Sequence, residues 1–182
     1  VMGGVHGANR HGGNALTDVT VFGVRAAKKA VEYIQSIELE DVDDLAESEI
    51  EYYENLTSRE VGYTPPTLMD LVRDNMWNNV GVIRDSFMLV DAYTRLSEIR
   101  DSTRSILAKP GKQLLNALEL IMALDVCEFI IRAAMERRES RGAHFRLDHP
   151  EEDPAWRKTI ILSKKDDAIQ VTHAALGEAF EP

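Results

Sequence analysis

The chain has 182 residues, of which 44% are hydrophobic and 29% are charged, and its formal net charge at pH 7 is -10. This length and composition are typical of a folded globular protein with a sizeable core, and the negative charge argues against direct binding to nucleic acid or to an anionic membrane surface. No apolar run approaches the length that spans a bilayer, and the single cysteine, Cys127, excludes an intramolecular disulfide.

The first stretch with a chemical pattern is a glycine-rich loop at residues 5–16, with the sequence VHGANRHGGNAL. Its three glycines permit positive φ and let a ligand approach the backbone, while Asn14 is expected to cap the helix that follows. Arg10 offers a planar fork of donors that matches a carboxylate or a phosphate. The pattern therefore predicts a helix N-terminus that holds an anion. The alternative is a plain turn with Arg10 in solvent.

A helix is expected next, from about Ala15 to about Ile37, because apolar residues recur there at helical spacing. The stripe consists of Val19, Phe22, Ala26, Ala30, Val31 and Ile34. Such a stripe suits packing against a sheet, which this chain mostly lacks. We therefore expect the helix either to pack on the helices downstream or to associate with a second copy.

Residues 38–54 form an acidic segment that has nine carboxylates and no basic residue. A solvated helix face explains this run better than a metal site, because nothing supplies convergent ligands with a defined loop geometry. A short helix is expected from about Asp43 to Asn55, anchored by Leu45, Ile50 and Tyr53. Thr57 to Pro66 then indicates a loop and a boundary.

Two amphipathic helices are predicted beyond this loop. The first is capped by Thr67 and stops near Val80, and the second runs from about Ser86 to Ala108, where Pro110-Gly111 follows. Trp77 lies one position off the apolar stripe of the first helix. A side chain that fixes the junction between two helices is the preferred interpretation, and a binding aromatic is the alternative.

A third long helix, from about Lys112 to Arg138, is apolar nearly all round and is expected at the centre of the fold. Cys127 lies within it and is interpreted as a small buried hydrophobe. The basic pair Arg137-Arg138 is expected to stabilise the negative end of the helix. The sequence thus predicts a mainly α fold built on a bundle of three long helices.

The last part of the chain begins with SRGAHFR at residues 140–146, which is expected to place two arginines and a histidine in an exposed turn. One interpretation is a capped helix end whose arginines bind carbonyls or nearby acids. Farther on, Thr159 to Leu162 and Ala168 to Thr172 are expected to pair as a small antiparallel hairpin, with a short tail after it.

Three stretches of the sequence together resemble one known family. They are GGVHGANRHGGNALTDVTVFGVRAA at 3–27, RDNMWNNVGVIRD at 73–85 and ESRGAHFRLDHPEED at 139–153. In the same order, they resemble segments of the flavoprotein subunits of succinate dehydrogenase and fumarate reductase, a family whose relatives include L-aspartate oxidase. Three spaced motifs in register are much harder to obtain by chance than one.

The resemblance covers essentially the whole chain and implies the C-terminal portion of a larger flavoprotein, because no Gly-x-Gly-x-x-Gly dinucleotide fingerprint occurs in it. Residues 1–40 would be the remnant of an α/β FAD-binding domain, contributing the first helix. Residues 41–66 would be an acidic helix and linker, and residues 67–182 a helical C-terminal domain with a β-hairpin tail.

The chemistry that the resemblance implies is hydride transfer between a dicarboxylate and FAD, which interconverts succinate and fumarate. By the same resemblance, Arg10 clamps a substrate carboxylate, and the helix start holds the flavin through Gly13, Asn14, Ala15 and Leu16. No metal site is expected. FAD belongs to the full-length protein, and this portion alone is expected to be inactive and not to retain it.

The two histidines of the loop have separate interpretations. His6 matches a histidine that is common in the motif and is expected to shape the loop without transferring protons. His11 stands where the resembled family usually has leucine. We expect it to face solvent, and an effect on substrate preference is the alternative.

The resemblance also implies partners and a location. A separate iron–sulfur subunit is expected, because the one cysteine cannot ligate a cluster. Direct membrane insertion and nucleic-acid binding are not expected. The protein would be cytoplasmic, either free or at the inner face of the membrane through partner subunits, and the turn at 140–146 would contact a neighbouring domain. The alternatives are a portion of L-aspartate oxidase and a non-catalytic helical interaction module.

Overall fold

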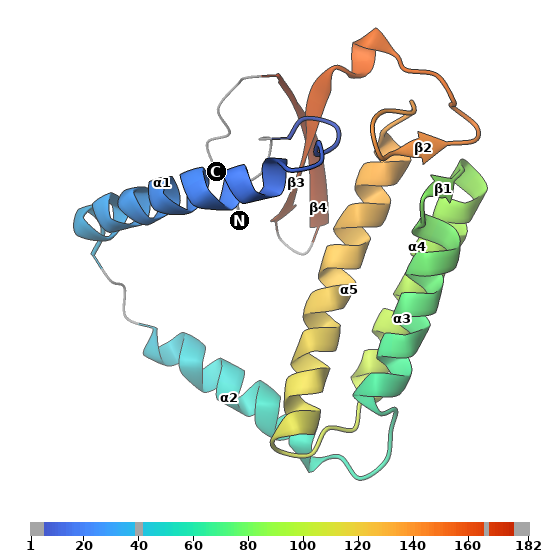
Figure 1. The fold of residues 1–182 in the computed structure, drawn as a ribbon. Coiled ribbons are helices and arrows are strands. Elements are labelled where there is room, and N and C mark those ends of the chain that lie inside the picture. The colour runs from blue at the N-terminus through green and yellow to red at the C-terminus, as the bar shows by residue number, and fades with distance from the viewer. Residues whose placement is uncertain (1–5, 39–41, 166–167, 177–182) are drawn as a thin grey trace. The chain divides into compact units, whose positions relative to one another are not determined.

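The computed structural model describes residues 6–38, 42–165 and 168–176. Within these ranges the chain forms five α-helices, two short 3₁₀ helices and two pairs of strands (Figure 1). Contacts divide the chain into two compact units, residues 1–50 and residues 51–182. The mainly helical architecture with a C-terminal hairpin confirms the predicted fold class, and the three-part domain division stays a prediction.

The first unit contains α1 (Asn14–Ser36) and the beginning of α2 (Asp43–Ser58). No residue of α1 is buried, and the side chains of its stripe are mostly exposed, with Val19 at 66% and Ile34 at 66%. Its bounds lie within one residue of the prediction. Glu40 and Asp41 of the acidic segment lie outside the described residues.

The expected cap of α1 by Asn14 is wrong. Gly13 is the N-cap residue and adopts the left-handed conformation with φ 85°, and no side chain caps the helix. Asn14 is instead the first helical residue, and its amide donates to the carbonyl of His11 at 3.3 Å. Because Asn14 already has helical backbone, its side chain is not placed to accept from the amides of the first turn as an N-cap side chain does.

The second unit is built on α3 (Pro65–Val80), α4 (Ser86–Ser102) and α5 (Lys112–Glu136), which pack side by side (Figure 1). Each helix contributes apolar side chains at helical spacing to one core. The core includes Leu68, Val72, Leu89, Ala92, Leu96, Ala117, Leu120, Leu124 and Ile131. Ala92 and Ala117 are fully buried, because small side chains let neighbouring helices approach closely.

Two helix ends differ from the prediction. The expected cap at Thr67 is wrong, since α3 begins at Pro65 with Thr64 as its N-cap residue. A proline in the first turn lacks only an amide that would have no partner there. The predicted end of the second helix at Ala108 is also wrong. It ends at Ser102, where Thr103–Ser105 tighten into a 3₁₀ helix.

Two strand pairs complete the unit. The parallel pair β1 (Ile83–Arg84) and β2 (Phe145–Arg146) lies at one end of the bundle. The antiparallel pair β3 (Lys158–Lys165) and β4 (Ala168–Ala175) follows a 3₁₀ turn at Pro154–Trp156. This confirms the predicted hairpin and extends both strands. The turn residues Asp166 and Asp167 and the tail from residue 177 lie outside the described residues.

Some apolar side chains that we expected inside lie at the surface. Trp77 is 82% exposed, so the interpretation that it fixes a helix junction is wrong. The helix α5 is buried on one side only, because a stripe along its other side is exposed: Leu115, Met122, Val126 and Ile130. Cys127 is half-buried and packs against the core, and burial raises the pKa of its thiol.

Candidate functional site

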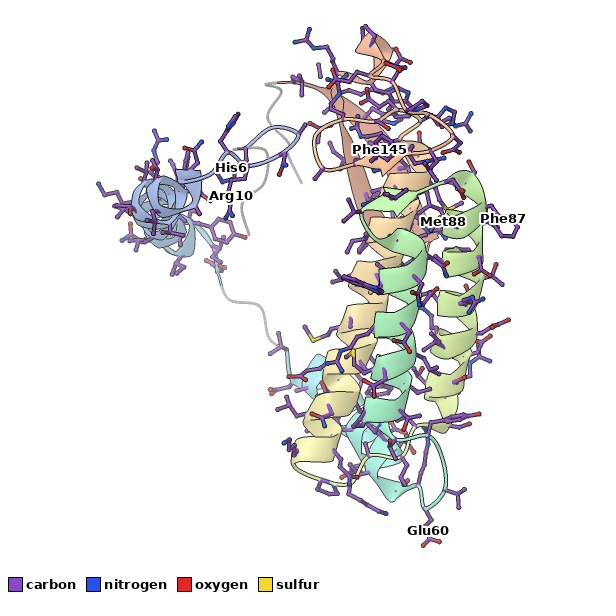
Figure 2. The ribbon with its side chains drawn as sticks, turned by 45° about the vertical axis from the view of Figure 1, so that its right-hand side comes forward. His6, Arg10, Glu60, Phe87, Met88 and Phe145 are labelled. Carbon is purple, nitrogen blue, oxygen red and sulfur yellow. The ribbon has the colours of Figure 1, made fainter. Side chains whose placement is uncertain are left out.

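The loop that precedes α1 carries the first candidate site. Figure 2 shows His6 and Arg10 on this loop, next to the N-terminal end of the helix. Residues 7–14 are all exposed. Arg10 has no hydrogen-bond or ion-pair partner within the described part of the chain, so all its donors are available to a ligand.

The start of α1 at Asn14 lies four residues after Arg10 in the chain and is open. An α-helix leaves the amides of its first turn without helical acceptors, and no side chain supplies one here. A Cβ placed on Gly7, Gly12 or Gly13 would meet nothing within 4 Å. The positions predicted to hold the flavin, Gly13 to Leu16, therefore form one exposed helix start with space around its backbone. Such a start stabilises negative charge.

A contact that the sequence analysis missed closes this loop. His6 Nε2 lies 3.2 Å from Asp18 Oδ2, and the two side chains are 27% and 29% exposed. The contact joins the first part of the loop to the second turn of α1, which agrees with the expectation that His6 shapes the loop. His11 is exposed, as expected.

The second polar region lies at the end of the bundle, and here the expected exposed turn at 140–146 is wrong. Arg146 is 1% exposed. Its guanidinium donates to the carbonyl of Ala134 at 2.8 Å and to that of Arg137 at 3.2 Å, where α5 ends. This geometry confirms the interpretation that an arginine of the turn binds helix-end carbonyls.

Arg146 also ties α4 to the end of α5. Its Nε and Nη2 donate to Asp148 at 2.8 and 2.7 Å, and Nη2 donates to Ser86 Oγ at 2.9 Å. Asp148 in turn accepts the amide of Ser86 at 3.0 Å, in the first turn of α4. Hydrogen bonds from Arg146 and then from Ser86 hold the pKa of Asp148 well below its usual value.

Glu139 forms a second buried charge cluster beside it. Its carboxylate is fully buried and accepts from Arg141 at 2.8 Å, from Arg137 at 2.6 Å and from the amide of Asp153 at 2.9 Å. These hydrogen bonds, the one from Arg141 foremost, lower the pKa of Glu139 from 4.5 to about 2. The carboxylate therefore stays charged at neutral pH.

Arg137 does not have the role expected from the sequence. The helix α5 ends at Glu136, so its last turn contains no basic residue. Arg137 instead donates to the carbonyls of Trp156 and Lys158, each at 2.9 Å. It thereby connects the end of α5 to the start of the hairpin.

His144 lies between two groups of opposite hydrogen-bonding character. Its Nδ1 is 3.4 Å from Arg84 Nη1, which can only donate, and its Nε2 is 3.4 Å from the carbonyl of Arg137, which can only accept. Burial, followed by the charge of Arg84, lowers the pKa of His144. The neutral ring with its proton on Nε2 satisfies both contacts.

A hollow of about 480 Å³ lies between α4, α5 and the hairpin. Its charged lining is already paired, since Arg100 donates to Asp125 at 2.8 Å and to Glu128 at 3.1 Å. The charges that line this hollow are thus paired within the fold, whereas Arg10 has no partner among the described residues and lies close to an open helix start. The loop before α1 remains the best candidate for ligand chemistry.

No helix in the described ranges combines the length and apolarity needed to cross a membrane. The family described as fumarate reductase flavoprotein C-term matches residues 70–179, which include all three helices of the bundle except the first five residues of α3. The matched range begins 60 residues after Arg10, so it does not include the loop before α1.

Curated relatives extend the similarity to most of the chain. The chain is 37% identical over 169 residues to a fumarate reductase (CoM/CoB) of Methanothermobacter marburgensis, covering 91% of this chain and 31% of the relative. It is 29% identical over 171 residues to an L-aspartate oxidase of Acinetobacter baylyi, covering 92% and 30%. The chain thus spans about a third of the length of these relatives.

A solved structure shares the fold. The quinol fumarate reductase of E. coli matches with a TM-score of 0.86 at 25% identity, over 98% of this chain and 33% of the other. The three independent similarities agree with one another and with the helical architecture. The chain belongs to the family of the C-terminal portion of fumarate reductase and succinate dehydrogenase flavoproteins.

Proposed function

We propose that this chain is the C-terminal portion of an FAD-dependent oxidoreductase that interconverts succinate and fumarate, and that its helical bundle supports the FAD-binding domain. The names of its relatives support this function. The observation that carries the proposal is the position of Arg10, exposed and without a partner among the described residues, four residues before the open start of α1.

The residues present fit the flavin. The glycines on both sides of Arg10 have open space where a side chain would lie, so a flat ring system can approach the backbone. The amides of Ala15 and Leu16 lie in the uncapped first turn of a 23-residue helix. They would hold the electron-rich edge of the ring and stabilise negative charge there. When bound, FAD supplies the hydride chemistry.

Arg10 would contribute binding and orientation of the substrate. Its guanidinium can donate two parallel hydrogen bonds to one carboxylate, which fixes the direction of a dicarboxylate as well as neutralising its charge. A lysine at this position would keep the charge but not the direction. The reaction depends on holding the reacting carbon within a narrow range of geometry.

Partner subunits are part of the same proposal. The matched Mycobacterium smegmatis structure is that of an Sdh1 complex, and we infer that the protein containing this chain also assembles with other subunits. An iron–sulfur subunit is the partner expected, and the protein would be cytoplasmic, either free or held at the inner face of a membrane through partner subunits. This chain has one cysteine and cannot itself ligate a cluster, so the cluster ligands would come from outside it.

The test is an Arg10→Lys variant of the protein that contains this chain. We expect flavin content to stay unchanged while kcat/KM for fumarate, assayed with a reduced dye, falls by about 10²-fold or more, because the directional contact is lost. Arg25→Lys is a matched control. Arg25 is also an exposed arginine, on α1, and its only partner within the described residues is the ring of Phe22.

Two results would contradict the proposal. Near-normal turnover of Arg10→Lys would exclude the clamp, and absence of both flavin and fumarate turnover in the unmodified protein would exclude the function. A second candidate, L-aspartate oxidase, is favoured by the relatives at 29% and 30% identity. Oxidation of L-aspartate without turnover of succinate or fumarate would select it.

A further inference from the structure

The loop that carries Arg10 is held at two points. Inside the loop, the amide of Asn14 donates to the carbonyl of His11 at 3.3 Å. Across its base, His6 Nε2 lies 3.2 Å from Asp18 Oδ2. The first contact fixes only the turn into the helix, whereas the second spans the whole segment from residue 7 to residue 17.

Apart from these two contacts, little defines the shape of the segment from residue 7 to residue 13. Three of the seven residues from Gly7 to Gly13 are glycines, and two of them have positive φ, 59° at Gly7 and 85° at Gly13. Glycine has more accessible backbone conformations than any other residue, so such a segment samples many shapes unless its ends are fixed.

The contact between His6 and Asp18 is also better protected than the loop it closes. Both side chains are less than one third exposed, whereas residues 7–14 are exposed throughout. A hydrogen bond shielded from water is less readily exchanged for hydrogen bonds to solvent. Asp18 lies in the second turn of α1, so the contact fixes the position of the loop relative to a rigid helix.

We propose that His6 and Asp18 are a pair of positioning residues that fix the loop against α1 and so present the guanidinium of Arg10 to the dicarboxylate. The inference rests on the proposed function, in which Arg10 clamps a substrate carboxylate. The pair acts through the loop and does not itself touch the substrate. Without the contact between His6 and Asp18, Arg10 samples directions in which it cannot bind the substrate carboxylate.

The proposal predicts a specific kinetic pattern. A misplaced clamp weakens substrate binding in flavin-loaded protein, so KM rises, and kcat falls as well where orientation is lost. A merely structural role would instead reduce the flavin-loaded fraction, which lowers apparent kcat at constant KM. The ratio of the two parameters therefore separates positioning from folding.

The experiment compares His6→Ala, Asp18→Ala and the double variant in the protein that contains this chain. We expect each single variant to raise KM for fumarate at least 10-fold at unchanged flavin content. The double variant should be no worse than either single one, because both remove the same contact. His6→Gln should stay within about 3-fold of the unmodified protein, since the glutamine amide can donate where Nε2 does.

Lys29→Ala is the matched control, because it removes an ion pair from α1 that lies outside the loop. Lys29 Nζ is 2.6 Å from Glu32 Oε2, and the two side chains are 80% and 63% exposed. We expect KM to be unchanged in this variant. An equal rise of KM in Lys29→Ala would overturn the proposal, because any weakening of α1 would then suffice.

A second readout does not depend on turnover. Phenylglyoxal modifies arginine side chains, and mass spectrometry gives the rate at Arg10 with and without malonate, a dicarboxylate that is not turned over. We expect malonate to protect Arg10 at least 5-fold in the unmodified protein and in His6→Gln, but less than 2-fold in His6→Ala.

The outcomes separate this inference from the proposed function. If the unmodified protein has flavin and fumarate turnover but KM and malonate protection are unchanged in His6→Ala and Asp18→Ala, the positioning role is overturned and the function stands. If the unmodified protein has neither flavin nor protection of Arg10, the proposed function fails and this inference fails with it. Additive effects of the two substitutions would also overturn it.

Discussion

Two arginines of this chain show opposite uses of the same side chain. Arg146 is buried, and its guanidinium N–H groups donate to carbonyls, a hydroxyl and a carboxylate, so its donors are satisfied within the fold. Arg10 is exposed and has no partner in the described ranges. Its five donors are therefore open to water and to a ligand, and the carboxylate clamp at this position stays a proposal.

Glu139 is a residue for which burial and charge predict a large effect on stability. We expect Glu139→Gln to lower the free energy of unfolding by about 1–3 kcal/mol, because two arginines lose a charged acceptor inside the fold. Chemical denaturation at pH 7 measures this change in the free energy of unfolding. The control is Glu152→Gln, which removes the other carboxylate bound to Arg141. Glu152 is 64% exposed, so its loss should cost less than about 1 kcal/mol.

The same carboxylate predicts a dependence on pH. The pKa of Glu139 is lowered from 4.5 to about 2 in the folded state. Its contribution to stability is therefore complete above pH 4.5 and is lost as the pH falls from 4.5 towards 2. We expect the unmodified protein to lose more stability over this range than Glu139→Gln does. Parallel stability curves for the two proteins over this range would contradict the assignment.

At this scale the sequence could not predict contacts between distant residues. The glycine-rich pattern around Arg10 indicated an anion-binding loop or a plain turn, and the clamp role, which comes from the family resemblance, stays a prediction. Arg146 was expected in solvent, because its partner Ser86 lies 60 residues earlier and no periodicity connects the two. The contact of His6 with Asp18 was missed for the same reason, since it spans 12 residues with a loop between them.

The helices were predicted well because their apolar spacing is a local signal. The predicted starts of α4 and α5 are correct, and the start of α1 is within one residue. Their ends are less predictable, because tertiary contacts decide them. The helix α4 stops six residues early, since the chain at Ser105 and Leu107 pairs with Tyr63 at 2.9 and 2.8 Å and leaves the helical path.

Gly62 makes that pairing possible and gives a test at this scale. It lies before α3 with φ 159°, and a Cβ there would collide with the carbonyl oxygen of Ser105. We expect Gly62→Ala to lower the free energy of unfolding by about 2 kcal/mol or more, because backbone must shift to relieve the collision. Urea denaturation followed by circular dichroism measures the change.

Gly111 supplies the control for this substitution. It also has positive φ, 90°, but a Cβ there would meet nothing within 4 Å. Gly111→Ala should therefore cost only the backbone strain at φ 90° and ψ -133°, about 1–3 kcal/mol, and less than Gly62→Ala, where the collision adds to the strain. If the two variants were equally stable, the approach of Ser105 to Gly62 would have no energetic weight, and the early end of α4 would need another cause.

Over the whole molecule, the burial of apolar residues differs between the two units. The second unit buries one continuous core between three helices, which accounts for the correct prediction of a bundle. The first unit buries no residue of its main helix, although that helix has a clear apolar stripe. The stripe suits a sheet, and the described part of the chain has only two-stranded sheets, neither of them in the first unit. The expected cover of α1, by the helices downstream or by a second copy, stays a prediction.

This division predicts a large difference in amide hydrogen exchange within the isolated chain. Exchange from α1 needs only local opening, since no side chain of the helix is buried, whereas exchange from the core of α5 needs unfolding of the bundle. With a typical domain stability of about 5–15 kcal/mol, we expect α5 amides around Leu120 and Leu124 to exchange at least about 10³-fold more slowly than those around Val24. Mass spectrometry of peptic peptides measures both exchange rates in one sample.

Equal protection of the two helices would refute the prediction and show that α1 is covered. Protection that falls on dilution would identify a second copy as the cover, and protection independent of concentration would identify the bundle.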